Sequence, residues 1–382
     1  PSEALDVTGN VRVSGNITAQ TLIISSSVTN LTTQFASGST RFGDTQDDLH
    51  EFTGSLMISG ARIALTNGVA SNYIGLRSGG SSGTQNVGIG DDVLSNSDDG
   101  AQNTAVGNSA MAVGNVGNNN TGIGGQSLVD ATGNSNTAVG FQSGFNLTSA
   151  VGSVAIGYRS MYNGTATGDY NTSLGAFSGN ALTSGEENVL IGREAGVTLT
   201  TTSNTVLIGA HAGYALNSTD ANGAVIIGHR AGRSLTHPAA TVLIGSGSGA
   251  NLTTADSNVV VGHRALPVGT TAQANTIVGS FGAAALTTGQ YNTFVGYQVA
   301  NSTTTASGSV FLGWTAGSSV TTGNDNIAIG KKAMNAGATS GDNNIAIGAF
   351  AGDALTSGYS NVLIGLNAGG SVNTGVFNTA GK

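Results

Sequence analysis

The amino-acid sequence predicts an all-β protein, a parallel β-solenoid (β-roll or β-helix) of about seventeen repeats of about 17 residues. A phrase close to Asn-Val-x-Ile-Gly occurs seventeen times, and each copy ends in a glycine that we call the marker glycine. A period this short, kept over so many copies, is typical of stacked coils and not of a globular core. The marker glycines are Gly90, Gly107, Gly124, Gly140, Gly157, Gly175, Gly192, Gly209, Gly228, Gly245, Gly262, Gly279, Gly296, Gly313, Gly330, Gly348 and Gly365.

The chain before the repeats has a different pattern. In residues 1–70, turns such as Gly9-Asn10 and Gly15-Asn16 separate short apolar segments, so we expect a short β-meander or triple-β region for attachment or trimerisation. The acidic cluster between Asp44 and Glu51 lacks the spacing and glycine of an EF-hand, which favours a solvated loop over a cation site. Residues 71–382 are expected to form the solenoid shaft, with Gly75 as a degenerate first marker.

Each repeat is expected to form a short strand over the residues that precede its marker glycine. The first and third strand residues, such as Val189 and Ile191, are mostly β-branched and point to one face, while the middle residue points to the other. Middle residues are apolar in the central copies, for example Leu190 and Leu243. A strand that is apolar on both faces is buried on both. We therefore expect the middle residues to face outward, covered by other copies of the chain in a homotrimer.

The remaining positions of the repeat predict its turns. Asn stands four residues before the marker glycine in most copies, as at Asn171 and Asn258, where identical side chains can form a hydrogen-bonded ladder. The glycine itself indicates a corner that requires positive φ or close backbone approach. A small residue follows three positions later, and a Leu four positions after that is expected to fill the far end of the coil before a polar turn. This Leu is found at Leu147, Leu182, Leu199, Leu216, Leu235, Leu252, Leu286 and Leu355.

Composition excludes several classes of function. The chain has 61 Gly in 382 residues, 8% charged residues and no Cys, which excludes disulfides, cysteine-ligated zinc and thiol catalysis. A net charge of −8 argues against a nucleic-acid partner, and no apolar stretch is long enough for membrane insertion. The start at Pro1 and the lack of a cap before Lys382 lead us to expect a processed product or part of a longer chain.

Two resemblances follow from these residues. Ser153-Val-Ala-Ile-Gly157, Asn326-Ile-Ala-Ile-Gly330 and Asn344-Ile-Ala-Ile-Gly348 resemble the head repeats of trimeric autotransporter adhesins, which implies a left-handed parallel β-roll assembled as a homotrimer. The segments 4–18 and 42–60 are similar to tail-fibre proteins of marine, cyanobacterial-type bacteriophages. The second resemblance implies a virion location and other fibre or baseplate proteins as partners.

The sequence does not predict an enzyme. The segment Gly245-Ser-Gly-Ser-Gly249 lacks the lysine of a phosphate loop, and a regular solenoid offers no cleft for paired carboxylates such as Glu186-Glu187. His211, His229 and His263 fall at a common corner with Glu194 as the one nearby carboxylate, which favours exposed turn residues over a metal site. No cofactor is expected.

Candidate binding residues cluster in the two positions after the marker glycines. Aromatic and basic side chains there can stack on sugars and pair with anionic glycans, although a corner that merely points outward would also tolerate them. The candidate glycan-binding residues are Tyr158, Arg159, His229, Arg230, His263, Arg264, Tyr297, Trp314, Lys331 and Lys332.

Three functions follow from the sequence. The first is the structural shaft of a homotrimeric virion tail fibre that takes part in host attachment. The second is a bacterial surface adhesin head that binds host or matrix glycans, with an extracellular or cell-surface location. The third, suggested by Thr pairs such as Thr200-Thr201 and Thr253-Thr254, is an ice-binding solenoid, although these residues lie in turns of variable length.

Overall fold

The computed structural model describes Ser14, the backbone of residues 64–66 and 71–73, and residues 85–95, 100–113, 116–218, 222–237, 239–335 and 337–381. The chain divides into two units, Pro1–Ser59 and Gly60–Lys382. The description below concerns the second unit. The predicted short-strand region over residues 1–70 lies, apart from Ser14 and residues 64–66, outside the described residues, as do the acidic cluster and Gly75.

The described residues contain twenty short strands and no helix. Accordingly, this part of the chain has no helix that could cross a membrane. The strands are β1 (Ala64–Thr66), β2 (Ser71–Tyr73), β3 (Val87–Ile89), β4 (Thr104–Val106), β5 (Thr121–Ile123), β6 (Thr137–Val139), β7 (Val154–Ile156), β8 (Thr172–Leu174), β9 (Val189–Ile191), β10 (Val206–Ile208), β11 (Val225–Ile227), β12 (Val242–Ile244), β13 (Val259–Val261), β14 (Thr276–Val278), β15 (Thr293–Val295), β16 (Val310–Leu312), β17 (Ile327–Ile329), β18 (Ile345–Ile347), β19 (Val362–Ile364) and β20 (Thr379–Gly381).

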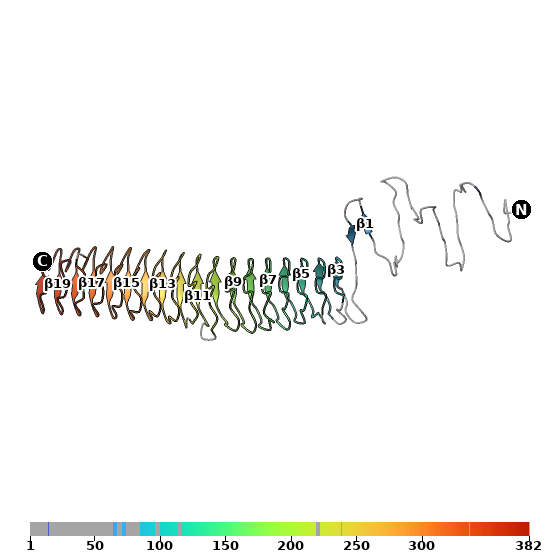
Figure 1. Ribbon diagram of the computed structural model, residues 1–382, viewed down its shortest axis with the longest axis horizontal. Helices are drawn as coiled ribbons and strands as arrows, with labels where there is room; N and C mark the ends of the chain where they lie inside the picture. The colour runs from blue at the N-terminus through green and yellow to red at the C-terminus, as the bar shows by residue number, and fades with distance from the viewer. Residues whose placement is uncertain are drawn as a thin grey trace. The chain divides into compact units, whose positions relative to one another are not determined.

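Strands β3 to β20 form one parallel ladder, which confirms the predicted β-solenoid. Each strand pairs in register with the strand of the next coil, as in Val206↔Val225 and Ile208↔Ile227. The ladder is an open stack and not a closed barrel, because no register joins β20 to β3, and these strands lie at opposite ends of the stack in Figure 1. All seventeen marker glycines directly follow a strand, from β3 to β19, and β20 adds a degenerate eighteenth coil. Strands β1 and β2 form a separate antiparallel pair.

The predicted orientation of the strand residues is wrong. Leu190 and Leu243, which we expected to face outward, are fully buried inside the coils, whereas Val189 and Ile191 are only partly buried at the surface. The same pattern of a buried middle residue between two more exposed ones holds from β3 to β19. The physical reason is that the first and third side chains pack sideways against their equivalents in adjacent coils, which suits β-branched residues on an outer sheet face.

The coil interior explains why the middle strand residue varies from Gly to Phe. The fourth residue after the marker glycine compensates for its size: Leu207 stands with Gly213, whereas Ala155 stands with Met161. A Cβ atom on Gly213 would lie 3.0 Å from Leu207 Cδ2, closer than ordinary packing permits. In such coils a large residue on one wall faces a small one on the other, although Ala138 with Gly144 and Ala346 with Gly352 show that not every coil follows this rule.

The predicted asparagine ladder is confirmed, and it also holds the backbone. Asn275 Nδ2 donates to Asn258 Oδ1 at 3.2 Å and to the Gly289 carbonyl at 3.0 Å. Asn275 Oδ1 in turn accepts from the backbone N–H of Asn292 at 3.0 Å. Because these groups are buried, each bond satisfies a polar atom that water cannot reach.

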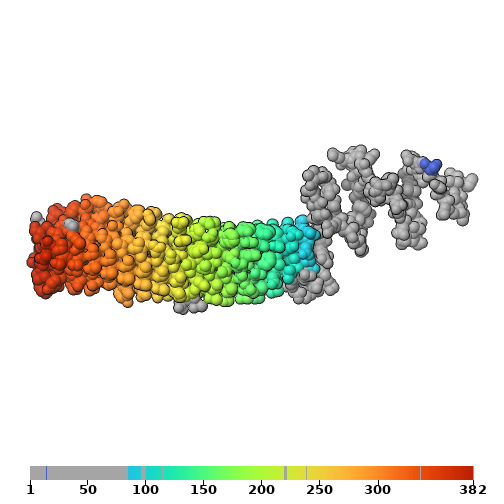
Figure 2. Space-filling view, viewed as in Figure 1, coloured from blue at the N-terminus to red at the C-terminus, as the bar shows by residue number. Residues whose placement is uncertain are grey.

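The predicted reasons for the marker glycines are also confirmed. Gly192 has φ +127°, and a Cβ atom there would lie 2.7 Å from the carbonyl oxygen of Gly209 in the next coil. Positive φ and close backbone approach thus act together at the corner. At the far end of the coils, Leu199 and Leu216 are fully buried as predicted. Figure 2 shows the result, a straight solenoid in which successive coils pack without interruption.

Candidate functional site

The two residues after each marker glycine form an edge of the solenoid that we call the corner row. The second of them has left-handed backbone in every coil, with φ 52° at Arg159, 57° at Arg230 and 57° at Lys332. Its N–H donates to the preceding coil, as from Lys332 to the Trp314 carbonyl at 3.0 Å. The backbone is therefore fixed, and each side chain lies beside its equivalent one coil away. All ten predicted glycan-binding residues belong to this row.

An aromatic cluster surrounds Tyr158 and Arg159 in the N-terminal part of the row. The Tyr158 ring stacks on Phe141, with centroids 6.0 Å apart, and meets Phe177 edge-on at 5.2 Å. The Arg159 guanidinium lies 5.2 Å from the centre of the Tyr158 ring, and its Nε donates to Gln142 Oε1 at 2.8 Å. These contacts order an aromatic surface that remains open to solvent, because Phe141 and Tyr158 are exposed.

A second cluster groups Trp314, Lys331 and Lys332 near the C-terminal end of the row. The ammonium groups of Lys331 and Lys332 lie 5.0 and 5.4 Å from the centre of the Trp314 ring, and both lie 5.8 Å from the Phe350 ring. Two cations over two aromatic rings form a cation–π arrangement at the surface. The structure thus brings together three residues that the sequence proposed separately.

Arg193, Glu194 and His211 form a polar cluster between these two groups. Arg193 Nη1 lies 2.7 Å from Glu194 Oε1, and Arg193 Nη2 lies 2.6 Å from His211 Nε2. His211 Nδ1 lies 3.1 Å from Glu194 Oε2, but the angles between these groups do not allow a hydrogen bond.

The pKa of His211 is lowered, chiefly because burial disfavours its charged form. Glu194 raises this pKa in opposition, while Arg193 and Arg230 lower it further. A neutral imidazole can accept the hydrogen bond from Arg193 at Nε2, so the lowered pKa agrees with the geometry.

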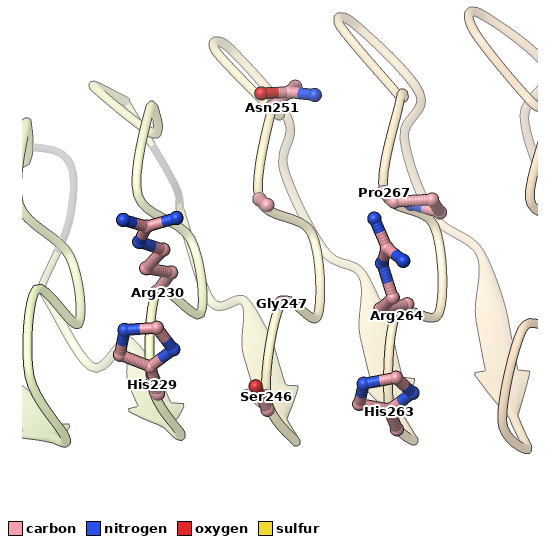
Figure 3. Close-up of a pocket in the computed structure, with 9 residues that line it drawn as sticks. His229, Arg230, Ser246, Gly247, Asn251, His263, Arg264 and Pro267 are labelled. Atoms are coloured by element: carbon pink, nitrogen blue, oxygen red, sulfur yellow. The ribbon is translucent and has the colours of Figure 1, made fainter.

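A hollow of about 320 Å³ opens in the corner row where one coil lacks large side chains. Arg230 and Arg264 extend on either side of Gly247, and His229 and His263 lie beside them (Figure 3). Gly247 is the second corner residue of the coil between the two arginines, and it belongs to the glycine-rich segment that we compared with a phosphate loop. We call this site the basic hollow.

The basic hollow continues into aromatic side chains on one flank. His263 meets Phe281 edge-on with centroids 5.1 Å apart, and Phe281 meets Tyr297 at 6.2 Å. Tyr297 is therefore linked to the basic hollow through Phe281. The Trp314 cluster begins one coil beyond Tyr297, whereas the Tyr158 cluster lies several coils away on the other side of the hollow.

The described ranges contain no group of three or more His, Asp or Glu side chains placed to hold a metal ion. His211 and His229 are neighbours, with ring centroids 6.4 Å apart, but His263 lies two coils beyond His229. The corner histidines are thus distributed along the axis instead of converging on one point.

A second candidate site is the surface made by the first and third residues of β3–β20, which we call the outer strand face. Apart from the final Gly381, these residues are Val, Ile, Leu or Thr, and none carries a charge. Several are exposed, for example Ile123, Leu174 and Ile364. A contiguous apolar surface of this length is typical of an interaction site.

Sequence reasoning missed the outer strand face and the role of Gly247. It assigned the wrong residues to the surface, and it compared the glycine-rich segment only with a phosphate loop. The signal for the basic hollow was a glycine at a corner position that carries Arg in both neighbouring coils. No protein-family model, curated protein or solved structure matches this chain.

Proposed function

We propose that this chain is the structural shaft of a homotrimeric virion tail fibre that takes part in host attachment. The observation that carries the proposal is the outer strand face, an uncharged apolar surface along the whole ladder. The chain's own described residues leave this face partly exposed, as at Ile208 and Ile244. Burying such a surface against other copies removes apolar area from water.

The size of the outer strand face suits an interface between copies. Eighteen strands spaced by about 4.8 Å, each about 10 Å long, give a face of about 80 by 10 Å, or on the order of 800 Å². A standard protein interface buries about 800 Å² on each partner. Three copies that turn these faces toward a common axis would therefore form a stable stiff rod.

The virion location and the fibre or baseplate partners rest on the resemblance of segments 4–18 and 42–60 to phage tail fibres. The described solenoid fits this role because its regular coils would hold a host-binding element at a fixed distance from the particle. A shaft of this kind requires stiffness, and the continuous parallel ladder supplies it.

The corner row favours an adhesin head as the second candidate, because its exposed aromatic and basic side chains are suited to glycans. The ice-binding alternative has less support. Thr hydroxyls in the polar turns already donate to the next coil, for example from Thr253 to the Thr270 carbonyl at 2.9 Å. Such hydroxyls are not arranged as a free array for ice.

The assembly is tested by measuring the mass of the chain in solution with size-exclusion chromatography and light scattering. We expect three times the mass of one chain. The double variant Ile208→Lys/Ile244→Lys places charges on the outer strand face, where burial of an unpaired charge is costly, and should dissociate into folded monomers. The control Thr201→Lys/Thr254→Lys adds the same charge to exposed turn residues and should remain a trimer.

A monomeric or dimeric wild-type chain would contradict the trimer. The virion assignment is tested separately by reading the genes that flank this one. Tail and baseplate genes support the fibre shaft, whereas a surface-anchored secretion partner would support the adhesin instead.

A further inference from the structure

We propose that the basic hollow binds an acidic saccharide, with a carboxylate or sulfate group held between Arg230 and Arg264. This inference goes beyond the shaft role, because it gives the side of the solenoid a ligand of its own. It requires that the corner row stays open in the assembled fibre.

The first argument is charge. Within the described residues neither Arg230 nor Arg264 forms an ion pair, and no carboxylate lines the hollow. The chain as a whole has a net charge of −8, so two unneutralised guanidinium groups around one hollow are a local exception. Guanidinium groups bind carboxylate and sulfate oxygens through paired hydrogen bonds, which favours an oxyanion as the ligand.

The second argument is shape. The backbone of Gly247, with φ 68°, follows the same left-handed corner as Arg230 and Arg264, so the hollow arises from a missing side chain and not from a change of fold. A Cβ atom on Gly247 would meet only Arg264 Cγ, at 3.4 Å. The space beside Gly247 is therefore open to a ligand, with Ser246 and Asn251 as further polar groups in its lining.

The third argument is the apolar flank, which distinguishes a saccharide from a small inorganic ion. The His263, Phe281 and Tyr297 rings continue from the hollow along the corner row. Aromatic faces and edges provide the surface on which the apolar face of a sugar ring packs. The oxyanion of the ligand would thus bind in the hollow, and its sugar ring would pack on the adjacent aromatic side chains.

The experiment measures binding by isothermal titration calorimetry with a sulfated hexasaccharide, a uronic-acid hexasaccharide and a neutral hexasaccharide. Two variants test the hollow. Arg230→Ala/Arg264→Ala removes its charge, and Gly247→Gln fills it without changing the charge, at a backbone position where Gln142 and Gln298 occur in other coils. The matched control Arg193→Ala/Arg233→Ala removes two positive charges from residues that do not line the hollow.

We expect the wild-type chain to bind at least one acidic hexasaccharide and to bind the neutral one much more weakly. Arg230→Ala/Arg264→Ala should weaken binding about tenfold or more because charge-assisted hydrogen bonds are lost, and Gly247→Gln should do the same because its side chain occupies the space of the ligand. The Arg193→Ala/Arg233→Ala control should stay within about twofold of the wild type. The acidic hexasaccharide that binds with the higher affinity shows whether the hollow prefers a sulfate or a carboxylate group. The mass of each variant in solution shows whether the assembly is intact, so failure of the trimer and failure of this site are distinguishable.

The proposal is overturned if neither acidic hexasaccharide binds, or if Gly247→Gln binds as the wild type does. It is also overturned if the Arg193→Ala/Arg233→Ala control loses as much affinity as Arg230→Ala/Arg264→Ala, because binding would then follow total charge alone. Equally tight binding of duplex DNA would also overturn the proposal, because it would show that the chain binds any polyanion.

Discussion

Single residues hold this solenoid together through backbone constraints more than through their own size. Gly192 occupies a corner that no Cβ can enter, and Asn275 uses its amide to bond backbone and side-chain groups on both neighbouring coils. These roles were predictable from the sequence, because each residue type has a distinct backbone or hydrogen-bonding capacity and recurs at a fixed offset. The contacts of His211 were not predictable, since they depend on the one Arg-Glu pair that stands in the preceding coil.

Acidification is expected to destabilise the coil that carries His211. Its folded-state pKa lies below the ordinary value of 6.5, so below about pH 6.5 the unfolded chain takes up a proton that the folded chain resists. The stabilising contribution is therefore complete above pH 6.5 and declines as the pH falls toward the folded pKa. The measurement is the midpoint of thermal unfolding between about pH 7.5 and 5.5, the range in which histidine titrates.

The variant His211→Gln provides the comparison, because Gln occupies the same corner position at Gln142 and Gln298. The other histidines and the carboxylates remain in both proteins. We expect the midpoint of the wild type to fall more steeply with decreasing pH than that of the variant. Equal slopes would show that His211 contributes nothing to the pH dependence.

At the scale of the coil, the sequence predicted the strand, the corner, the asparagine ladder and the interior Leu, but it gave the strand the wrong orientation. The two faces were both apolar, so hydrophobicity alone could not distinguish inside from outside. The sizes of the residues could have distinguished the inner face from the outer one. Middle residues such as Leu207 and Ala155 vary inversely with Gly213 and Met161, and such compensation is expected only between side chains that fill the same space.

This compensation predicts a strong coupling between Ala328 and Met334, which are both fully buried. Ala328→Leu overpacks the coil and should cost about 1–3 kcal/mol. Met334→Gly leaves a cavity and should cost about 2–5 kcal/mol. The double variant recreates the Leu-Gly combination of Leu207 and Gly213, so adding Met334→Gly to Ala328→Leu should raise the midpoint of thermal unfolding.

The matched control combines Ala328→Leu with Met161→Gly, a cavity in a distant coil. Changes at distant sites are expected to add. The control should therefore unfold at a lower temperature than either single variant. If the Ala328→Leu/Met334→Gly variant behaves in the same additive way, the two residues do not share one space.

At the scale of the whole solenoid, the period of the sequence determines its length. Eighteen paired strands at about 4.8 Å each predict a straight segment of about 80 Å. Negative-stain electron microscopy of the purified chain should show this segment in side view. Compact particles without a straight segment would contradict the stack of coils.

The candidate site was predictable only in part at this scale. The sequence placed all ten candidate residues, from Tyr158 to Lys332, on one edge, because they share an offset from the marker glycines. It did not divide them into separate groups or reveal the basic hollow. Those features depend on which side chains meet between coils, and that is decided by neighbours about 17 residues away, as with Arg230, Gly247 and Arg264.

The direction of the hydrogen bonds has a mechanical consequence for this molecule. Bonds between coils, such as Gly209 N–H to Ile191 O at 2.7 Å, Gly196 N–H to Ala212 O at 3.0 Å and Thr198 Oγ1 to Tyr214 O at 2.8 Å, connect one coil to the next at several points around its perimeter. A tensile load along the rod is shared by all of them at once, whereas a load applied at one edge would open them in succession. The solenoid is thus strongest under axial pulling and weakest under sideways peeling, and two coils separate under axial tension only when the whole perimeter gives way together.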